Sequence, residues 1–360
     1  MNTKELNNFE DLKPPIINVG IIGWIKANLF NNWFNSILTL AVLFFFWKTI
    51  PPLFRWAFID SLWMSTGTEC HQSGGACWSI IPANIQFIIF GFYPADQQWR
   101  PLLAMILLAV LLIISRNRNF WNKTLFYIWI SGFFIMGLLM KGGLGLEPVE
   151  STQWGGLPLT LILSVFGLTA AYPLGIALAL GRQSKMPVIK VLSIVYIELI
   201  RGVPLISLLF MSAIIFPLFL PEGITLNKIF RAQAAIIMFT AAYVAEVVRG
   251  GLQAIPRGQY EAADSIGLNY FQTMRLIILP QALKIVIPPT VSVLISAFKD
   301  TSLVVIIALY DVLKTTQSTL SNPKWMGFST EAYIFVAVIY FVCCYFMSTW
   351  SRKLEKELST

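Results

Sequence analysis

The segment GLPLTLILSVFGLTAAYPLGIALALG (156–181) contains no charged residue over its whole length. A helix rises about 1.5 Å per residue, and about 20 mostly apolar residues cross the hydrocarbon core of a bilayer. The segment is therefore long enough to span a membrane. Its small residues, concentrated in 167–181, predict close packing against a neighbouring helix.

The composition indicates that the rest of the chain is also built for lipid. Of its 360 residues, 56% are hydrophobic and only 12% are charged, whereas soluble domains carry about 25% charged residues. We therefore expect an all-α, polytopic membrane protein. Eight apolar runs are candidate spans: 33–53, 99–115, 123–140, 156–181, 190–218, 231–250, 284–306 and 331–351.

The distribution of basic residues predicts the orientation. The net charge of +8 forms no basic stripe with interleaved aromatics, so we do not expect nucleic-acid binding. The basic residues instead cluster in short loops, as cytoplasmic loops do. With both termini in the cytoplasm of a multi-pass inner-membrane protein, 16 of the 26 lysines and arginines fall on the cytoplasmic side: Lys4, Lys13, Lys26, Arg116, Arg118, Lys123, Arg182, Lys185, Lys190, Arg249, Arg257, Arg275, Lys284, Arg352, Lys353 and Lys356.

The chain divides by character at a glycine-rich stretch, KGGLGLEPVESTQWGG (141–156). Residues 1–150 hold three spans and a long outer loop, and residues 151–360 hold five spans. Cys70 and Cys77 lie in the outer loop, where an oxidising compartment favours a disulfide. A metal site that includes His71 is the alternative, although no fourth ligand is nearby in the sequence.

A polar segment, YEAADSIGLNYFQTMRLIILPQ (260–281), interrupts the apolar pattern on the predicted cytoplasmic side. Residues 256–266 can form a short helix that Gly267 ends in a left-handed conformation. Asn269 can cap a second helix, with Gln272 as its capping-box partner, and Pro280 is expected to end it. The segment thus predicts two short helices outside the membrane.

The alanines Ala262 and Ala263 leave a narrow waist on the first helix, and Glu261 offers a charge to a basic partner. Such a pair of helices could be gripped by the groove of another protein. The alternative is an ordinary surface loop or an amphipathic helix that rests on lipid.

The spacing of this segment resembles the EAA loop (256–284) of ABC-transporter permeases. The matching positions are Glu261, Ala262, Ala263, Gly267, Ile277, Leu279 and Pro280. The neighbouring motifs ELIRGVPL (198–205), AAYVAEVVRGGLQAIPRGQ (241–259) and KDTSL (299–303) resemble the polar amino-acid permeases. Near the N-terminus, GACW (75–78) and FGFYP…WRP (90–101) resemble the long permease of general glutamate, glutamine, aspartate and asparagine importers.

The resemblance implies a role for the loop and a set of partners. In that family the EAA loop docks into a cytoplasmic ATPase dimer and couples nucleotide-driven closure to alternating access. The further partners implied are a second permease of different sequence, a periplasmic amino-acid-binding protein, a polar L-amino acid and membrane lipid. No cofactor is implied.

Charged residues inside the predicted spans are candidates for a substrate path, because each costs about 2.5–3.5 kcal/mol at mid-membrane. Glu198 and Arg201 share a helix face, Lys299 and Asp300 are adjacent, and Glu246 and Arg249 could brace a gate. Ion pairs that only hold helices together are the alternative. A path for a zwitterionic amino acid would add backbone groups and hydroxyls from Gly202, Pro204, Thr301 and Ser302.

A secondary transporter and a membrane enzyme are the two alternative classes of protein. A secondary transporter would be expected to show paired internal repeats, and the EAA segment occurs once. A membrane enzyme would need catalytic groups, yet the sequence has a single histidine and neither H-E-x-x-H nor G-x-S-x-G. The sequence also lacks a G-x-x-x-x-G-K-[ST] phosphate loop, so we expect ATP hydrolysis in a separate subunit.

Overall fold

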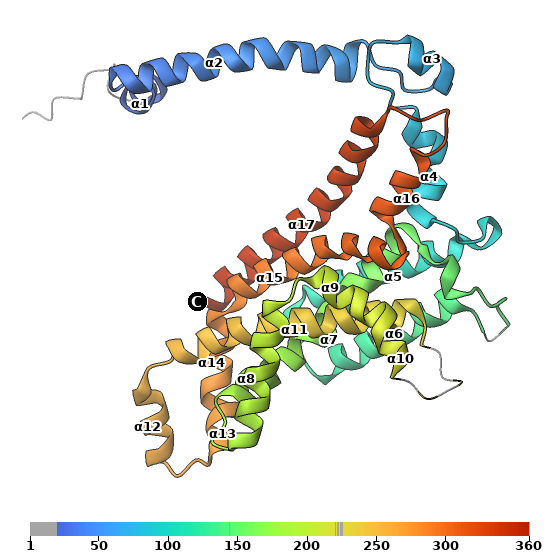
Figure 1. Cartoon of the computed structure of the whole chain (residues 1–360). Helices are drawn as coiled ribbons and strands as arrows, with labels where there is room; N and C mark the ends of the chain where they lie inside the picture. The colour runs from blue at the N-terminus through green and yellow to red at the C-terminus, as the bar shows by residue number, and fades with distance from the viewer. Residues whose placement is uncertain (1–19, 144, 220, 222, 224–225, 360) are drawn as a thin grey trace, which may run out of the picture. The chain divides into compact units, whose positions relative to one another are not determined.

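The computed structural model describes residues 20–143, 145–219, 221, 223 and 226–359. Lys4 and Lys13, which contribute to the predicted orientation, lie outside them. The chain forms two compact units, Met1–Ser79 and Ile80–Thr360, drawn in Figure 1. The predicted division at residue 150 rests on sequence character and stays a prediction.

The described part of the N-terminal unit holds the α-helices α1 (Gly20–Asn28), α2 (Trp33–Phe54) and α3 (Gly67–Gln72), with a π-helical turn, Arg55–Ile59, after α2. No residue of α2 is buried, which is the condition of a helix surrounded by lipid. Cys70 and Cys77 form a disulfide with their Cα atoms 5.6 Å apart. No cluster of three metal-ligating side chains occurs among the residues that the structure describes.

The second unit holds the remaining elements. They are α4 (Ile80–Phe90), α5 (Trp99–Ser115), α6 (Lys123–Lys141), α7 (Gly156–Arg182), α8 (Pro187–Gly202), α9 (Leu205–Phe210), α10 (Phe216–Leu218), α11 (Lys228–Ala254), α12 (Arg257–Ser265), α13 (Tyr270–Thr273), α14 (Leu279–Ile285), α15 (Ile287–Asp300), the two-residue strand β1 (Tyr310–Asp311), α16 (Val312–Thr319) and α17 (Ser329–Ser359). Figure 1 shows α12 and α13 at the end of this unit opposite α4 and α16.

The structure confirms the all-α, multi-span prediction. Within the described residues, seven helices are long and apolar enough to cross a membrane, and an eighth candidate is a bent pair. The short run 99–115 is among the seven, as Ala95–Ser115.

The span predicted at 190–218 is present as a bent pair of helices. This segment breaks between α8 and α9, and its two halves meet at 104°. Pro204 lacks a backbone N–H and disfavours helical geometry in the residue before it, so the helix ends at Gly202.

Close packing of α7 against α11 forms the centre of the second unit, as the small residues of 167–181 predict. A Cβ atom on Gly175 would lie 2.6 Å from Val244 Cγ1 and 2.9 Å from the Ala241 carbonyl oxygen. Gly167 meets Gln233 in the same way. Small residues therefore let the two backbones approach, which is how membrane helices gain van der Waals contact.

At the end of the unit opposite α12, the carboxylate of Asp311 ties three segments together. It accepts hydrogen bonds from the Lys314 backbone N–H (2.9 Å) and from the Tyr340 hydroxyl (3.3 Å), and the backbone of Asp311 pairs with Gly156. Asp311 is fully buried, and burial raises its pKa to about 6. The ionised form of Asp311 is therefore disfavoured in the folded protein, and the stability of the protein depends on pH.

We expect the stability of the protein to fall as the pH rises from about 4 to 6 and to level off above that. In this window the folded protein holds a proton on Asp311 that the unfolded chain has released, and the difference is worth about 3 kcal/mol. Asp311→Asn keeps a helix-capping side chain and should flatten this part of the profile. Thermal unfolding of the wild type and of Asp311→Asn in detergent, from pH 4 to 7, measures this difference. Parallel profiles of stability against pH would contradict the prediction.

Candidate functional site

The loop that follows α11 begins with α12, which carries Glu261 on its exposed side. The helix ends as predicted. Gly267 has φ +77, and the backbone N–H groups of Gly267 and Leu268 donate to the carbonyls of Asp264 and Ala263. This left-handed position turns the chain sharply into α13, and glycine adopts it without steric cost.

The second short helix starts with the capping box that the sequence predicts. Asn269 Oδ1 accepts from the Gln272 backbone N–H at 2.9 Å, and Gln272 Oε1 accepts from the Asn269 N–H at 3.0 Å. The prediction that Pro280 ends this helix is wrong. Helical geometry continues through a π-helical turn, Met274–Ile278, and Pro280 lies in the first turn of α14, where its missing N–H is tolerated.

The exposed surface of the loop differs in part from the predicted alanine waist. Ala262 is exposed, but Ala263 is fully buried. The loop also exposes large apolar side chains that the sequence reading did not single out: Ile266, Tyr270, Phe271 and Leu276. A cluster of this kind on a segment outside the membrane is typical of a protein-binding surface.

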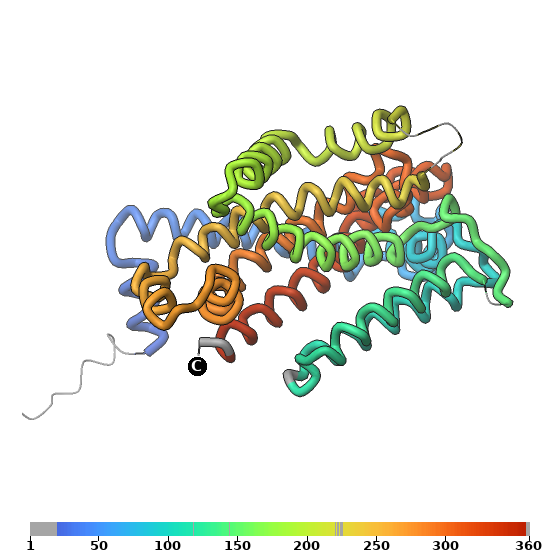
Figure 2. Tube along the Cα trace, turned by 90° about the horizontal axis from the view of Figure 1, so that it is seen from below, coloured from blue at the N-terminus to red at the C-terminus, as the bar shows by residue number. Residues whose placement is uncertain are grey.

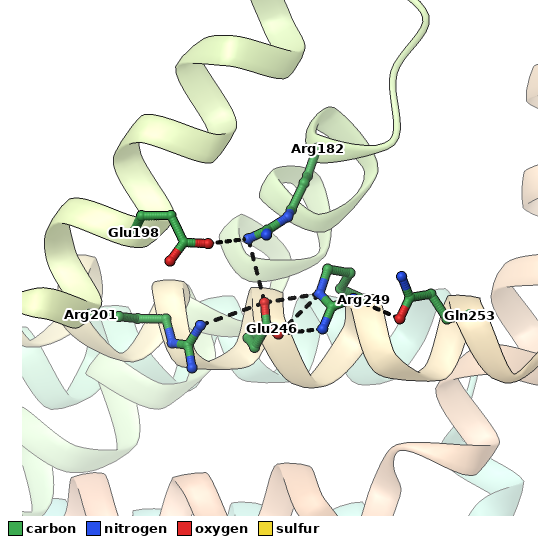
Figure 3. Close-up of polar contacts among 6 residues, drawn as sticks. All are labelled: Arg182, Glu198, Arg201, Glu246, Arg249 and Gln253. Atoms are coloured by element: carbon green, nitrogen blue, oxygen red, sulfur yellow. Dashed lines mark hydrogen bonds and ion pairs between the residues drawn. The ribbon is translucent and has the colours of Figure 1, made fainter.

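Near the C-terminal end of α11, a charged cluster joins three helices (Figure 3). The Glu246 carboxylate contacts Arg249 Nε at 3.0 Å, Arg182 Nη1 at 3.5 Å and Arg201 Nη1 at 3.6 Å. Arg182 also contacts Glu198 at 2.8 Å. Glu246 therefore links the C-terminal ends of α7, α8 and α11, about three turns before α12 begins.

The ion pair between Glu246 and Arg249 is present. In the alternative to a substrate path, Glu198 and Arg201 would neutralise each other, but each contacts a residue of another helix. The two side chains turn to different partners, because Arg182 at the end of α7 lies close to both acidic groups. Sequence reasoning missed Arg182 and counted it only as a loop charge. Its position directly after a charge-free span was the available signal.

The cluster has an excess of positive charge. It holds three arginines and two glutamates, so 3 − 2 leaves one unbalanced positive charge. The Arg201 Nε atom is buried with no hydrogen-bond partner. Its guanidinium lies 5.6 Å from the ring centre of Tyr243 on α11. This cation–π contact holds the guanidinium beside α11.

Lys299 and Asp300 also fail to pair with each other within the described part of the chain. Their side chains open into different cavities on two sides of α15. Lys299 lines a space of about 490 Å³ with Ser302 and residues of α17. Asp300 lines a pocket of about 330 Å³ between α11 and α15. Adjacent helical residues point about 100° apart, so both charges cannot face one cavity easily.

The α11–α15 pocket is rich in hydroxyl groups. Its walls are Phe239, Thr240, Tyr243, Ser292, Val293, Ser296, Ala297 and Asp300. Thr240 is only 1% exposed, and its Oγ1 has no hydrogen-bond partner among the described residues. Other hydroxyls in the spans, such as Thr160 and Thr169, donate to a carbonyl one turn back. An unpaired buried hydroxyl is costly, so that of Thr240 is suited to a polar solute.

Thr301 and Gly202 contribute differently from the prediction. The Thr301 hydroxyl is buried and donates to the Phe298 carbonyl, and the Ser302 hydroxyl donates to the Lys299 carbonyl. Gly202 and Pro204 form the break between α8 and α9. Of the eight predicted path residues, Asp300 lines the α11–α15 pocket, and Arg201 lies beside the wall residue Tyr243. Tyr243 was not among the predicted residues.

Comparison with known families matches residues 171–360 to the binding-protein-dependent transport system inner membrane component. Among solved structures, the chain is similar to a crystal structure of an amino acid ABC transporter with histidines. That similarity has a TM-score of 0.50 and 32% sequence identity, and it covers 56% of this chain and 92% of the other.

Two relatives match along nearly the whole chain. The chain is 46% identical to the inner membrane amino-acid ABC transporter permease protein YhdY of Escherichia coli, over 94% of this chain and 93% of that protein. It is 38% identical to the glutamate/glutamine/aspartate/asparagine transport system permease protein BztC of Rhodobacter capsulatus, over 96% and 95%. None of these matches supports a secondary transporter. The chain belongs to the binding-protein-dependent inner membrane components of ABC importers, among the amino-acid permeases.

Proposed function

We propose that this permease imports polar L-amino acids and that the α11–α15 pocket is part of their path. The names of the two full-length relatives support the substrate class. The observation that carries the proposal is the buried, unpaired hydroxyl of Thr240 in the same pocket as the Asp300 carboxylate. A carboxylate among hydroxyls suits the ammonium group that every amino acid carries.

The charged cluster is proposed to receive the opposite end of the solute. Arg201 stands over Tyr243, a wall residue of the pocket, and has a free buried donor. The cluster has one positive charge in excess, so a substrate carboxylate could compete with Glu246 for Arg201. Lys299 and Ser302, which open into the neighbouring cavity, stay candidates for a later part of the path.

We expect Asp300→Asn and Thr240→Val each to lower uptake at limiting substrate about ten-fold, since each leaves a polar group of the bound solute unpaired. Arg201→Gln should act in the same direction. Uptake of radiolabelled glutamate and glutamine by cells with the complete importer measures the effect. Thr169→Val, which removes a hydroxyl that donates to the Val165 carbonyl and does not line the pocket, is the control. Unchanged uptake in both pocket variants would refute the proposed path.

The coupling loop is proposed to bind the ATPase through its exposed face. Glu261 and the exposed side chains of Ile266, Phe271 and Leu276 supply one charge and an apolar surface. Gly267 fixes the angle between α12 and α13, while Ile277, Leu279 and Pro280 continue the helix back toward the membrane. The chain itself has no ATPase activity, and ATP hydrolysis takes place in a separate subunit.

The remaining partners and the orientation are proposed from the same family logic. A second permease completes the path, an extracytoplasmic binding protein delivers the amino acid, and both termini face the cytoplasm. The basic residues of the α5–α6 loop and of the end of α17 support this orientation. The Glu246–Arg249 pair is then a brace at the cytoplasmic end of the path.

A further inference from the structure

A small basic crevice lies between the end of α5 and the end of α17. It has a volume of about 230 Å³ and is lined by Leu112, Arg116, Phe346, Thr349, Trp350 and Lys353. In Figure 2 the tip of the α5–α6 hairpin and the C-terminal end of α17 lie at the same end of the unit. Both lining segments are the last turns of candidate spans, Ala95–Ser115 and Ser329–Glu357. The crevice therefore lies at the boundary between lipid and water.

One hydrogen-bond donor among the lining residues of this crevice has no acceptor in the part of the chain that the structure describes. The indole Nε1 of Trp350 is buried without a partner. Two other indoles at this end of the hairpin are satisfied: those of Trp121 and Trp129 donate to the Ser115 carbonyl (2.8 Å) and hydroxyl (2.9 Å). A buried indole N–H usually finds a partner. Trp350 is thus poised for an acceptor from outside the described chain.

The charge of the crevice is positive. Arg116 has no carboxylate oxygen within 4.0 Å among the residues that the structure describes. Lys353 reaches Glu357 at 3.7 Å, with the Lys353 side chain half exposed to solvent, and such surface pairs contribute little. Two cationic residues and a tryptophan therefore line one crevice together with the apolar side chains of Leu112 and Phe346.

We propose that this crevice binds the phosphate of an anionic phospholipid, with the acyl chains along Leu112 and Phe346. Phosphate oxygens match the guanidinium, ammonium and indole donors. Basic pockets between membrane helices on the cytoplasmic side suit anionic headgroups. The apolar wall and the position at the end of two spans favour a lipid over free phosphate. The lipid would join α5, from the N-terminal part of the chain, to α17, the last helix.

The test uses the complete importer purified in detergent and titrated with phosphatidylglycerol, phosphatidylcholine or inorganic phosphate. Native mass spectrometry counts the lipids retained. Arg116→Gln and Lys353→Gln should each weaken phosphatidylglycerol binding about five-fold, the effect of one basic residue at a membrane surface. Trp350→Phe keeps the ring, removes the donor and should also weaken it. Arg352→Gln makes the same charge change on the neighbouring residue, which does not line the crevice, and should have less than about half that effect.

The outcomes separate the possible sources of the ligand. Preferential retention of phosphatidylglycerol by the wild type, lost in the Arg116 and Lys353 variants but kept in Arg352→Gln, would support the proposal. Equal retention of phosphatidylcholine would overturn it, because the crevice would then hold any acyl chain. Displacement of the lipid by inorganic phosphate would also overturn it and would indicate a free-anion site. An equal loss of phosphatidylglycerol binding in Arg352→Gln would also overturn the proposal, because general surface charge would then explain the effect.

Discussion

Gly267→Val is expected to abolish uptake by the assembled importer while leaving the chain in the membrane. Gly267 has φ +77, which a β-branched residue adopts only at a cost of about 1–3 kcal/mol. The position is open, with nothing within 4 Å of an added Cβ, so a clash does not complicate the result. The strain acts on the turn between α12 and α13. The angle between the two helices should therefore change, and with it the shape of the exposed face of the loop. Uptake and co-purification of the ATPase measure it.

Gly267→Asn is the matched control, because asparagine tolerates left-handed geometry far better than valine. It should keep most of the uptake. Glu261→Lys offers an independent test of the same surface, since it leaves the backbone alone and reverses the exposed charge. Reversal of a charge at a docking surface costs on the order of 10- to 100-fold in association. Normal ATPase association together with normal uptake in both Gly267→Val and Glu261→Lys would rule out the coupling role.

Glu246→Gln is expected to have the second large effect. The carboxylate contacts three arginines from α7, α8 and α11. The neutral amide removes the negative charge that Arg201 and Arg249 share, while Glu198 still pairs with Arg182. Removal of one partner from a half-buried charged network costs about 2–3 kcal/mol. We expect a lower thermal stability of the purified importer and uptake reduced at least ten-fold, because the helices that precede the coupling loop lose their common link.

Glu198→Gln is the control for this prediction. Glu198 is about half exposed and contacts a single arginine, Arg182, so its removal should cost less than about 1 kcal/mol. A loss equal to that of Glu246→Gln would mean that net charge, and not the central position of Glu246, determines the effect. Thermal unfolding and uptake of the two variants, measured side by side, distinguish the two explanations.

The sequence predicted the elements whose signals are local. Length and apolarity identified the spans, and the glycine and the Asn269–Gln272 pair identified the loop turns, because helix caps depend on a few adjacent residues. Gly202 and Pro204 indicate a weak point in the helix, but the sequence does not predict the 104° angle between α8 and α9. That angle depends on what α8 and α9 pack against.

The side-chain partners could not be predicted because they lie far apart in the sequence. Glu198 and Arg201 are one turn apart, yet each binds a residue from another helix. The hydroxyl of Thr240 and the ring of Tyr243 gain their significance only when α11 packs against α15. The exposed apolar residues of the loop, such as Phe271, look like ordinary helix residues until their 68% exposure is known.

The central claim is that a separate ATPase drives this permease through the loop 256–284. Proteoliposomes that hold either this chain alone or the complete importer, each supplied with the binding protein and labelled glutamate or glutamine, test it directly. Uptake should occur only in the complete importer with ATP inside, and Glu261→Lys should abolish it. Accumulation driven by a proton or sodium gradient in vesicles that contain this chain alone would contradict the account.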